Sequence, residues 1–371
     1  MLRTASALAV AALAVASLLR PSPAMAQEKV TFNMSWLPQG SVIGPIVAVD
    51  KGYYKEAGLE VTLVRGYGGN RTANELDQGQ FQFGYVDPIS LILTRSNGGN
   101  IRLVGAINTR WPGGICFLDQ KVKDKSLDSL KGMQMGGGSA SPVHNVVPAW
   151  LEMNGKPRDY VRLLRMDPAV VDAALIEGKT DLAECWRGSN RAVLRKQASS
   201  AGVKVNWLEY SDFGLNAYGS GFAATEETIR TKPDLVRRFL KASYQGYEFA
   251  KANPRAAAQI TYGARPVLQK LISPQVALES MMQLASGYSV FHRRPPHLYG
   301  WHDPTSWNRY LDAIAKLGQT KSRLNINDVL TNELVRAANQ KADVARARRD
   351  ARAYTINEFF RTTTVPKGYP L

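Results

Sequence analysis

The sequence predicts an α/β protein built from two similar lobes, with a cleft between them and a helical C-terminal region. Short apolar runs with the length of strands alternate with amphipathic runs that have the spacing of helices, which is typical of a parallel α/β sheet. Two such series follow one another, and from Pro233 onward the pattern becomes mostly helical. The 371 residues suffice for two domains of ordinary size, and a hydrophobic content of 44% is normal for a globular protein.

The first series lies within residues 27–111, which we assign to the first part of lobe 1. Gly52 and Gly79 directly follow its two helical runs, as expected where helices end. We expect strands at residues 29–36, 59–65, 81–86 and 101–109, and helices near residues 43–47 and 71–78.

The second series lies within residues 112–217, which we assign to lobe 2, and residues 218–371 return to lobe 1 and form the C-terminal helices. Ser141-Pro142 and Asp167-Pro168 each place a capping side chain before a proline, a combination that favours a helix start. Short crossovers near residues 110–113 and 215–221 are expected to join the lobes. We expect strands at residues 114–118, 133–136, 182–186 and 203–208, and helices at residues 142–153, 168–177, 274–284 and 306–317.

The two series also resemble each other. Aligning Gly79 with Gly178 places one helix–glycine–strand unit on another, so that Tyr85 corresponds to Glu184. Any two such units would align, but the match is consistent with two lobes that present the ends of their strands to a shared cleft.

Residues 1–26 have the features of an export signal. Arg3 is followed by an apolar stretch over residues 5–19, and Ala24-Met25-Ala26 is typical of a cleavage site before Gln27. An uncleaved anchor is the alternative, but the apolar run is short for a bilayer and two prolines follow it. We therefore expect a mature protein in the periplasm.

The formal net charge of +16 would favour acidic ligands, nucleic acid or anionic membranes. The basic residues are nevertheless spread along the chain, and no nucleic-acid-binding module is recognisable. One cluster occurs near the C-terminus, at Arg346, Arg348, Arg349 and Arg352. We interpret the charge as a solvated cationic surface and expect no nucleic-acid partner.

The chain contains two cysteines, Cys116 and Cys185, too few for a scaffold built on disulfides. Export would allow them to pair, but both also fit the interior of buried strands as free thiols. Spacing alone does not decide between these alternatives.

Candidate ligand-binding residues follow from a general rule. Open parallel sheets bind ligands beyond the carboxyl ends of their strands, where helix N-termini also point. The loops at these ends combine aromatic rings with a few polar groups, as small-molecule sites do. The alternative is structural, with the aromatic rings packed in the core and the carboxylates capping helices or pairing with cations. The candidates are Trp36, Tyr67, Asn70, Arg71, Asp87, Trp111, Ser139, Ser141, Glu184, Trp186 and Tyr218.

The loop over residues 136–141 reads Gly-Gly-Gly-Ser-Ala-Ser and enters a helix at Pro142. Its glycines would let backbone N–H groups approach a ligand, while Ser139 and Ser141 add hydroxyl groups at the positive end of a helix. The loop is not a phosphate-binding P-loop, because the Gly-Lys-Ser/Thr ending is missing. A tight turn with a serine cap is the structural alternative.

Features of an enzyme are mostly missing, and we predict no cofactor, no metal site and no catalysis. His292, His297 and His302 with Asp303 match no common zinc spacing, and the nucleophile-elbow spacing does not occur. The alternative from another class is a pyrimidine-processing enzyme that uses Asp87 and Glu184 as its acid–base pair.

The chain resembles a known family of binding proteins. The resemblance is seen in five segments. They are Trp36-Leu37-Pro38, the Gly-Tyr-Tyr-Lys-Glu-Ala-Gly-Leu-Glu-Val stretch at 52–61, the 136–141 loop, and the runs at 127–132 and 233–242. They are similar to the NMT1-like family of periplasmic substrate-binding proteins for nitrate, sulfonate, taurine and thiamine-pyrimidine precursors. The likeness covers roughly residues 29–260.

This resemblance implies a type II periplasmic-binding-protein fold and a monomer that serves a membrane ABC permease and its ATPase. Family ligand contacts would fall on Trp36, Asn70, Ser139, Ser141 and Glu184. A related fungal group synthesises the thiamine pyrimidine and carries a cysteine-rich motif, which is missing here, so that activity is not carried over.

Two ligand classes fit the candidate residues. The rings with Asp87 and Glu184 suit a flat, nitrogen-bearing ring such as a pyrimidine. Arg71, Arg110 and Arg187 with the serine loop would suit a sulfonate, a nitrate or an aromatic acid. The abundance of aromatic side chains favours the ring.

Overall fold

The structure is a computed structural model that describes residues 26–38, 40–122, 124–263, 269–270, 272–285 and 295–364. The predicted signal peptide lies outside the described residues except for its last position, Ala26.

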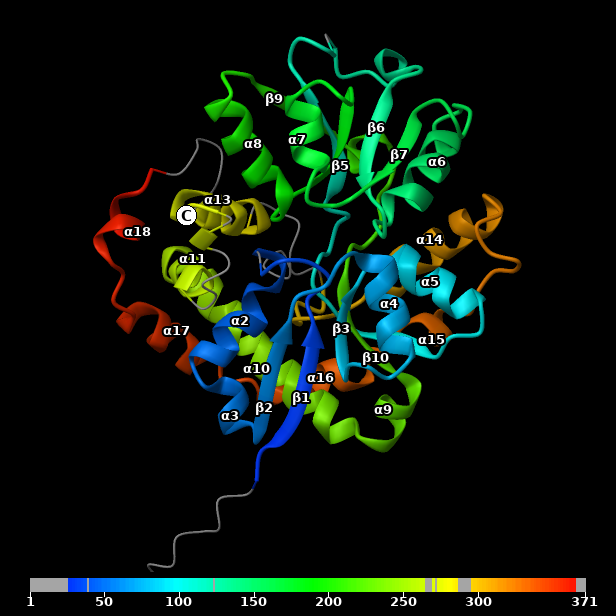
Figure 1. The fold of residues 1–371 in the computed structure, drawn as a ribbon. Helices are drawn as coiled ribbons and strands as arrows, with labels where there is room; N and C mark the ends of the chain where they lie inside the picture. Colours follow the sequence, from blue (N-terminus) through cyan, green and yellow to red (C-terminus); the bar gives the residue numbers. More distant parts are fainter. Residues whose placement is uncertain are drawn as a thin grey trace, which may run out of the picture.

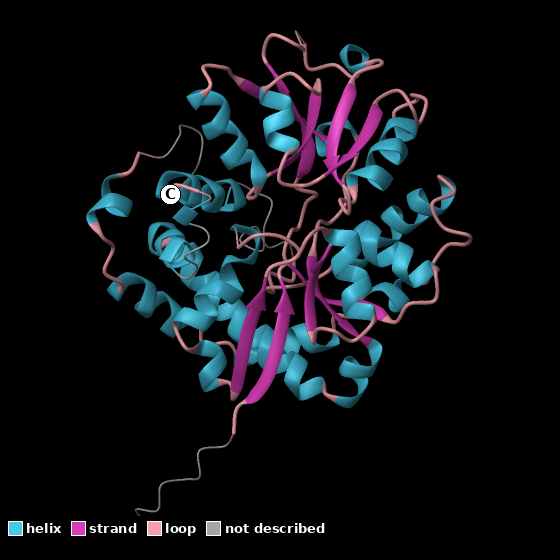
Figure 2. Ribbon diagram, in the orientation of Figure 1, coloured by secondary structure: helices cyan, strands magenta, loops and turns pink. Residues whose placement is uncertain are grey.

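Two five-stranded sheets, each flanked by helices, form the upper and lower halves of the molecule (Figures 1 and 2). We call the first sheet and its helices lobe 1, and the second sheet and its helices lobe 2. The first sheet has the order β2-β1-β3-β10-β4, with β1 at Glu28–Asn33, β2 at Leu59–Val64, β3 at Phe83–Val86, β4 at Ile101–Ala106 and β10 at Gly221–Thr225. The second has the order β7-β6-β8-β5-β9, with β5 at Gly113–Leu118, β6 at Gln134–Gly138, β7 at Arg162–Met166, β8 at Leu182–Trp186 and β9 at Val205–Glu209.

The two sheets have the same pattern of strand directions, which agrees with the resemblance between the two series. In each sheet one strand, β1 or β6, pairs in parallel with both of its neighbours. The sheets are mixed and not purely parallel, because β10 and β5 pair antiparallel with their neighbours. The physical reason is that the chain enters β5 and β10 directly from the other lobe, at the edge where the parallel strands end.

Two segments cross between the lobes, residues 107–112 and residues 210–220, the second beginning with a 3-10 helix, η3, at Tyr210–Phe213. They are hydrogen-bonded to each other, because Asn108 N donates to Ser220 O over 2.9 Å and Gly219 N donates to Asn108 O over 2.9 Å. The crossovers therefore form one paired strip.

Lobe 1 is built around a long helix, α10, at Pro233–Ala252. The ring of Phe239 on this helix stacks on Phe83 of β3 with 4.0 Å between ring centres. Gly246 approaches α2 so closely that a Cβ there would lie 2.0 Å from Gly44 O, which explains the small residue. The other helices of this part are α2 at Ile43–Asp50, α3 at Tyr53–Glu56, α4 at Gly69–Asp77, α5 at Pro88–Ser96 and α9 at Glu226–Thr231.

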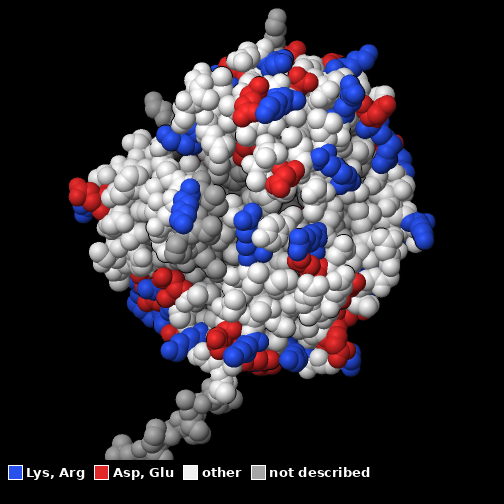
Figure 3. All heavy atoms as spheres, viewed as in Figure 1, with Lys and Arg blue, Asp and Glu red and all other residues white. Residues whose placement is uncertain are grey.

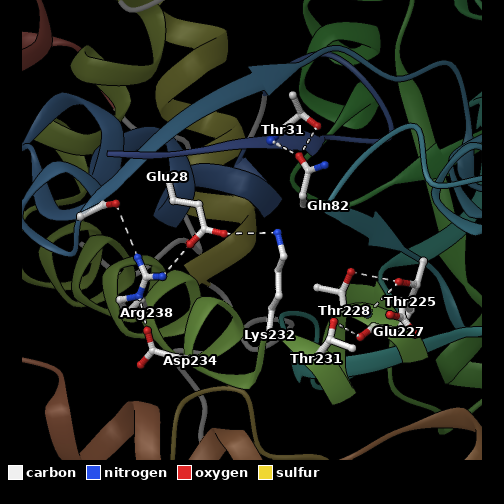
Figure 4. A network of polar contacts seen from close by, with 11 residues as sticks. Glu28, Thr31, Gln82, Thr225, Glu227, Thr228, Thr231, Lys232, Asp234 and Arg238 are labelled. Carbon is white, nitrogen blue, oxygen red and sulfur yellow. Dashed lines mark hydrogen bonds and ion pairs between the residues drawn. The ribbon is translucent and has the colours of Figure 1, made fainter. Parts of the chain in front are cut away.

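Polar contacts fasten β1 to α10 at the end of the sheet that lies away from lobe 2 (Figure 4). Glu28 accepts a hydrogen bond from Arg238 over 2.7 Å and pairs with Lys232 at 3.5 Å. Arg238 also donates to Asp234 over 2.6 Å. This end of the sheet is therefore tied by charged groups, and the opposite end is left for the cleft.

The C-terminal helices cover lobe 1 and reach lobe 2. Helices α16 and α17 pack on α10, and buried Glu248 accepts hydrogen bonds from Arg348 and Tyr299. None of the helices in the described ranges is long and apolar enough to cross a membrane. These helices are α11 at Pro254–Gly263, α13 at Pro274–Ala285, α14 at Pro304–Lys316, α15 at Ile326–Val329, α16 at Glu333–Lys341, α17 at Val344–Ala353 and α18 at Glu358–Thr362.

Lobe 2 carries α6 at Val143–Met153, α7 at Val171–Ile176 and α8 at Asn190–Ser200. The second predicted helix of this lobe starts three residues later than expected, because Asp167 accepts from the backbone of Ala169 over 2.8 Å in a turn that precedes α7.

A disulfide joins Cys116 of β5 to Cys185 of β8, which settles the alternative left open by the sequence. The two residues lie on neighbouring antiparallel strands, where Cys185 faces Gly114 and Cys116 faces Ala183. The bond closes a loop with a sequence separation of 69. Closing a loop of this length restricts the unfolded chain, which stabilises the folded protein.

We predict that the paired substitution Cys116→Ala and Cys185→Ala lowers the free energy of unfolding by roughly 2–4 kcal/mol. Urea denaturation measures this. Dithiothreitol should lower the free energy of unfolding of the wild type by a similar amount, whereas it should leave that of the variant unchanged. Equal stability of the two proteins without reductant would contradict the prediction.

Candidate functional site

One face of the site is an alternating row of arginines and rings on lobe 1. The loop after β2 carries Tyr67, which is 46% exposed. The guanidinium groups of Arg65 and Arg71 lie over its ring at 4.7 and 5.0 Å from the ring centre. Arg65 also lies 5.9 Å from the ring of half-buried Trp36. The row therefore offers accessible π surface, held in place by cation–π contacts.

The facing part of lobe 2 is organised by Glu184, which lies on β8 and is 9% exposed. Its Oε1 accepts from Gly138 N over 2.8 Å, while Oε2 accepts from the Ser141 hydroxyl and, over 2.9 Å, from Trp186 Nε1. A buried carboxylate needs such donors. Glu184 thereby fixes the glycine–serine loop and the Trp186 ring together.

Asn190, at the start of α8, joins the same unit and was not singled out by the sequence pattern. Its Oδ1 accepts from Trp186 N over 2.9 Å, and its Nδ2 donates to Glu184 O over 3.0 Å and to Asp172 Oδ1 over 2.9 Å. Burial, together with the nearby negative charge of Glu184, raises the pKa of Asp172 to about 7. Asn190 acts through its uncharged amide group, so neither charge nor a recognisable motif in the sequence points to it.

The lobes touch where the loop after β2 meets the glycine–serine loop. Asn70 N donates to Ala140 O over 3.3 Å, and Asn70 Nδ2 donates to Ser141 O over 3.5 Å. Asn70 Oδ1 accepts from Ser90 on lobe 1 over 2.7 Å. A Cβ on Gly68 would lie 2.6 Å from Ala140 O, so glycine permits the close approach. These contacts describe a closed arrangement of the lobes.

A groove lies beside this contact, and its walls come from both lobes. Ser139 is exposed, and its backbone is held by Met166 and by Arg165, which donates to Ser139 O over 2.8 Å. Figure 3 shows basic side chains on both sides of the furrow on this face. The groove is lined by Asn70, Arg71, Asn74, Glu75, Gln78, Gln80, Ser139, Ala140 and Arg165.

Three of the candidate residues are deeply buried. Asp87 caps α5 by accepting from Ser90 N over 3.0 Å, and burial raises its pKa. Trp111 is fully buried, with its ring 5.9 Å from that of Trp186. Tyr218 accepts from Asp303 N over 3.1 Å and packs near His302, where the C-terminal region returns to the crossovers.

The three arginines that the sequence suggested for an anionic ligand are each paired with a carboxylate. Arg71 lies 2.6 Å from Glu75 on α4. Arg110 lies 3.7 Å from Asp212 in the crossover. Arg187 is mostly buried and donates to Glu209 over 3.1 Å. An anion bound by these groups would have to compete with a carboxylate that is already in place.

The histidine segment serves the fold where it is described. His302 Nδ1 accepts from Trp307 Nε1 over 3.1 Å, and burial lowers the pKa of His302 to about 3. Asp303 caps α14. His292 lies outside the described residues. Within the described ranges, no group of three acidic, histidine or cysteine side chains is placed to hold a metal ion.

A second polar contact missed by sequence reasoning lies at the crossovers. Tyr85, at the end of β3, donates from its hydroxyl to Asn108 Oδ1. Burial raises the pKa of Tyr85 to about 12. Tyr85 occupies the position in lobe 1 that Glu184 occupies in lobe 2, so both central strands carry a buried polar side chain at their third residue.

Comparison with known proteins matches the family model described as NMT1/THI5 like to residues 39–257. The riboflavin-binding protein RibY of Chloroflexus aurantiacus is 26% identical over 319 residues, which cover 83% of this chain and 86% of RibY. The 4-amino-5-hydroxymethyl-2-methylpyrimidine phosphate synthase THI5 of Saccharomyces cerevisiae is 23% identical over 258 residues, which cover 67% of this chain and 75% of the synthase.

Solved structures show the same architecture. The alkanesulfonate-binding protein SsuA from Xanthomonas axonopodis pv. citri, bound to MOPS, superimposes with a TM-score of 0.62 at 15% identity and covers 83% of this chain and 98% of its own. The periplasmic nitrate-binding protein NrtA from Synechocystis PCC 6803 superimposes with a TM-score of 0.62 at 12% identity, covering 86% and 91%. The predicted two-lobed periplasmic-binding-protein fold is confirmed.

We predict that Asp172→Asn stabilises the protein more at pH 8 than at pH 5. The pKa of about 7 lies above the ordinary 3.8, so the folded state holds a proton that the unfolded chain releases between these values. Stability therefore falls as the pH rises through this window, and asparagine removes that loss. Urea denaturation across this pH range measures the difference. Asp159→Asn, at an exposed aspartate of the same lobe, is the control. A pH-independent difference for Asp172→Asn would contradict the prediction.

Proposed function

Because the chain belongs to the NMT1/THI5-like family, we propose that it is the solute-binding component of an ABC importer and works as a monomer in the periplasm. In this proposal the solute bridges the two lobes and favours the closed arrangement, which the membrane permease and its ATPase then accept. The names of SsuA and NrtA, both binding proteins with this fold, support it. The export signal that the sequence predicts at residues 1–26 also supports it.

The division into lobes fits this mechanism. We propose that residues 27–111 and 218–371 move as lobe 1 and that residues 112–217 move as lobe 2. The paired crossovers at 107–112 and 210–220 would form the hinge. The contacts of Asn70 with Ala140 and Ser141 are weak enough, at 3.3 and 3.5 Å, to be exchanged for water when the lobes separate.

We propose a neutral, nitrogen-containing aromatic ring as the solute, in the class of pyrimidines and the flavins that contain them. The observation that carries this choice is the aromatic ring of Tyr67, which is 46% exposed beside the groove. The pairing of Arg71, Arg110 and Arg187 with carboxylates supports it, because an anion would have to compete for these three groups. The exposed ring of Tyr67 can stack on a flat ligand. The relative RibY is named as a riboflavin-binding protein, which supports the same class.

A binding role also fits the two carboxylates better than catalysis does. The alternative enzyme would use Asp87 and Glu184 as an acid–base pair, and the relative THI5 is named as a synthase. Asp87 is engaged as a helix cap, and both oxygens of Glu184 accept hydrogen bonds from the protein. Glu184 would have to give up a structural contact to exchange a proton with a solute, and the oxygen of Asp87 that does not cap the helix, Oδ2, is buried away from the surface.

We predict that riboflavin or a substituted pyrimidine raises the melting temperature of the mature protein, whereas ethanesulfonate, nitrate and benzoate do not. A ligand that binds the folded state alone stabilises it by about 2.7 kcal/mol at a hundred times its Kd. Differential scanning fluorimetry, or calorimetry for the fluorescent flavin, measures the shift. Stabilisation by the anions only would reject the ring in favour of an anionic solute, and conversion of the pyrimidine into a new product would favour the enzyme.

We predict that Tyr67→Ala weakens binding of the stabilising ring by about fivefold, because a stacked aromatic contact contributes roughly 1 kcal/mol. Tyr160→Ala is the matched control, since Tyr160 also lies beside a cation, Lys156 at 5.3 Å, but outside the proposed site. Isothermal titration measures both Kd values. Equal affinities of the two variants would remove Tyr67 from the site.

A further inference from the structure

Helix α13 belongs to lobe 1 by its apolar face. Leu278, Met281 and Met282 are almost completely buried and form part of the core that contains α2 and α10. Figure 1 shows α13 between α11 of lobe 1 and α8 of lobe 2. An apolar contact of this kind is costly to expose, so the helix stays with lobe 1 when the lobes move.

The opposite face of α13 is polar and holds lobe 2. Ser280 Oγ donates to Gly188 O over 2.7 Å, and Gly188 N donates to Gln283 Oε1 over 3.1 Å. Both backbone groups of one residue of lobe 2 are thus satisfied by one helix of lobe 1. Glu279 pairs with Arg195 on α8 and accepts from Gln283 Nε2 over 3.0 Å.

The loop after β1 meets the same point. Gly40 N, which begins the 3-10 helix η1 at Gly40–Val42, donates to Ser280 Oγ over 3.3 Å. A Cβ on Gly40 would lie 2.7 Å from Ser280 O and 3.3 Å from Gly188 O. The loop after β1 and the loop after β8, which contains Gly188, therefore converge on α13.

We propose that the polar face of α13, formed by Glu279, Ser280 and Gln283, is a clasp that sets the balance between the open and closed arrangements of the lobes. This proposal rests on the proposed function in one respect, because it assumes that closure of the lobes captures the solute. The clasp lies at the opposite side of the lobe contact from Asn70 and acts without touching the solute. It also positions Trp186, two residues before the clasped Gly188.

The chemistry of the clasp suits a reversible contact. When the lobes separate, its polar groups exchange protein partners for water at small net cost, whereas the apolar face remains packed. In the closed form these groups are buried, with Gln283 completely inaccessible and Ser280 6% exposed. A clasp residue that loses its hydrogen-bonding group then leaves a backbone group of Gly188 buried without that partner, and this penalty falls on the closed form alone.

The test compares Gln283→Ala with Gln275→Ala, a substitution at an exposed position of the same helix. Spin labels on Glu60→Cys in lobe 1 and Asp159→Cys in lobe 2, both exposed, report the distance between lobes by double electron–electron resonance. We expect Gln283→Ala to shift the ratio of open to closed populations about tenfold toward open, with or without solute, and Gln275→Ala to leave it unchanged. Ser280→Ala, which removes a smaller group, should shift the ratio in the same direction.

A riboflavin titration separates this proposal from the choice of solute. If the clasp holds the closed form and riboflavin is the solute, Gln283→Ala raises its Kd by up to about the same factor. If riboflavin binds none of the variants but the distances still shift, the clasp stands and the solute assignment fails. Distances in Gln283→Ala and Ser280→Ala that match those of Gln275→Ala would overturn the clasp.

Discussion

The arrangement of the candidate site depends on one buried carboxylate. Glu184 sits near the end of the central strand of lobe 2, where it would be costly to keep charged without donors. The backbone of Gly138, the hydroxyl of Ser141 and the indole of Trp186 supply them. Three segments that are distant in the sequence are thereby held at one point. The loop that touches lobe 1 and the ring that faces the cleft take their positions from this carboxylate.

The common strand order of the two lobes explains why function gathers at one edge. In both sheets the strands that pair in parallel end toward the other lobe, and the chain must cross there to enter its antiparallel strand. The crossing segments leave no room for long loops, so recognition falls on short loops and helix starts. Tyr85 and Glu184 lie at equivalent positions of the two central strands, yet Tyr85 is hydrogen-bonded to a crossover and Glu184 to the glycine–serine loop of its own lobe. Under the proposed function, the same framework would serve as a hinge on one side and as a wall of the binding site on the other.

The sequence predicts those helices and strands whose apolar residues recur at a regular spacing. The strand at Leu182–Trp186 was expected at these residues because a continuous apolar run marks a buried strand. The edge strand Arg162–Met166 was missed because it is mostly exposed, and the short strand Gly221–Thr225 because its small residues carry no strand signal. The first strand ends before Trp36, since Ser35 adopts a φ of 64° that no pattern of polarity announces. Candidate side chains were found by their place at strand ends, but Asn190 and Gln283 were not, because an amide acts through partners that only the fold brings near.

The two lobes are joined by both apolar and polar contacts. One apolar cluster runs from lobe 1 through Trp111 and Tyr218 of the crossovers into lobe 2, whereas the disulfide between Cys116 and Cys185 lies wholly within lobe 2 and stabilises that lobe alone. The contacts between the lobes at the cleft are hydrogen bonds and one ion pair, which water can replace. Under the proposed function, a solute that presents a flat apolar face to Tyr67 would add apolar burial to these contacts, and closure would then follow from binding.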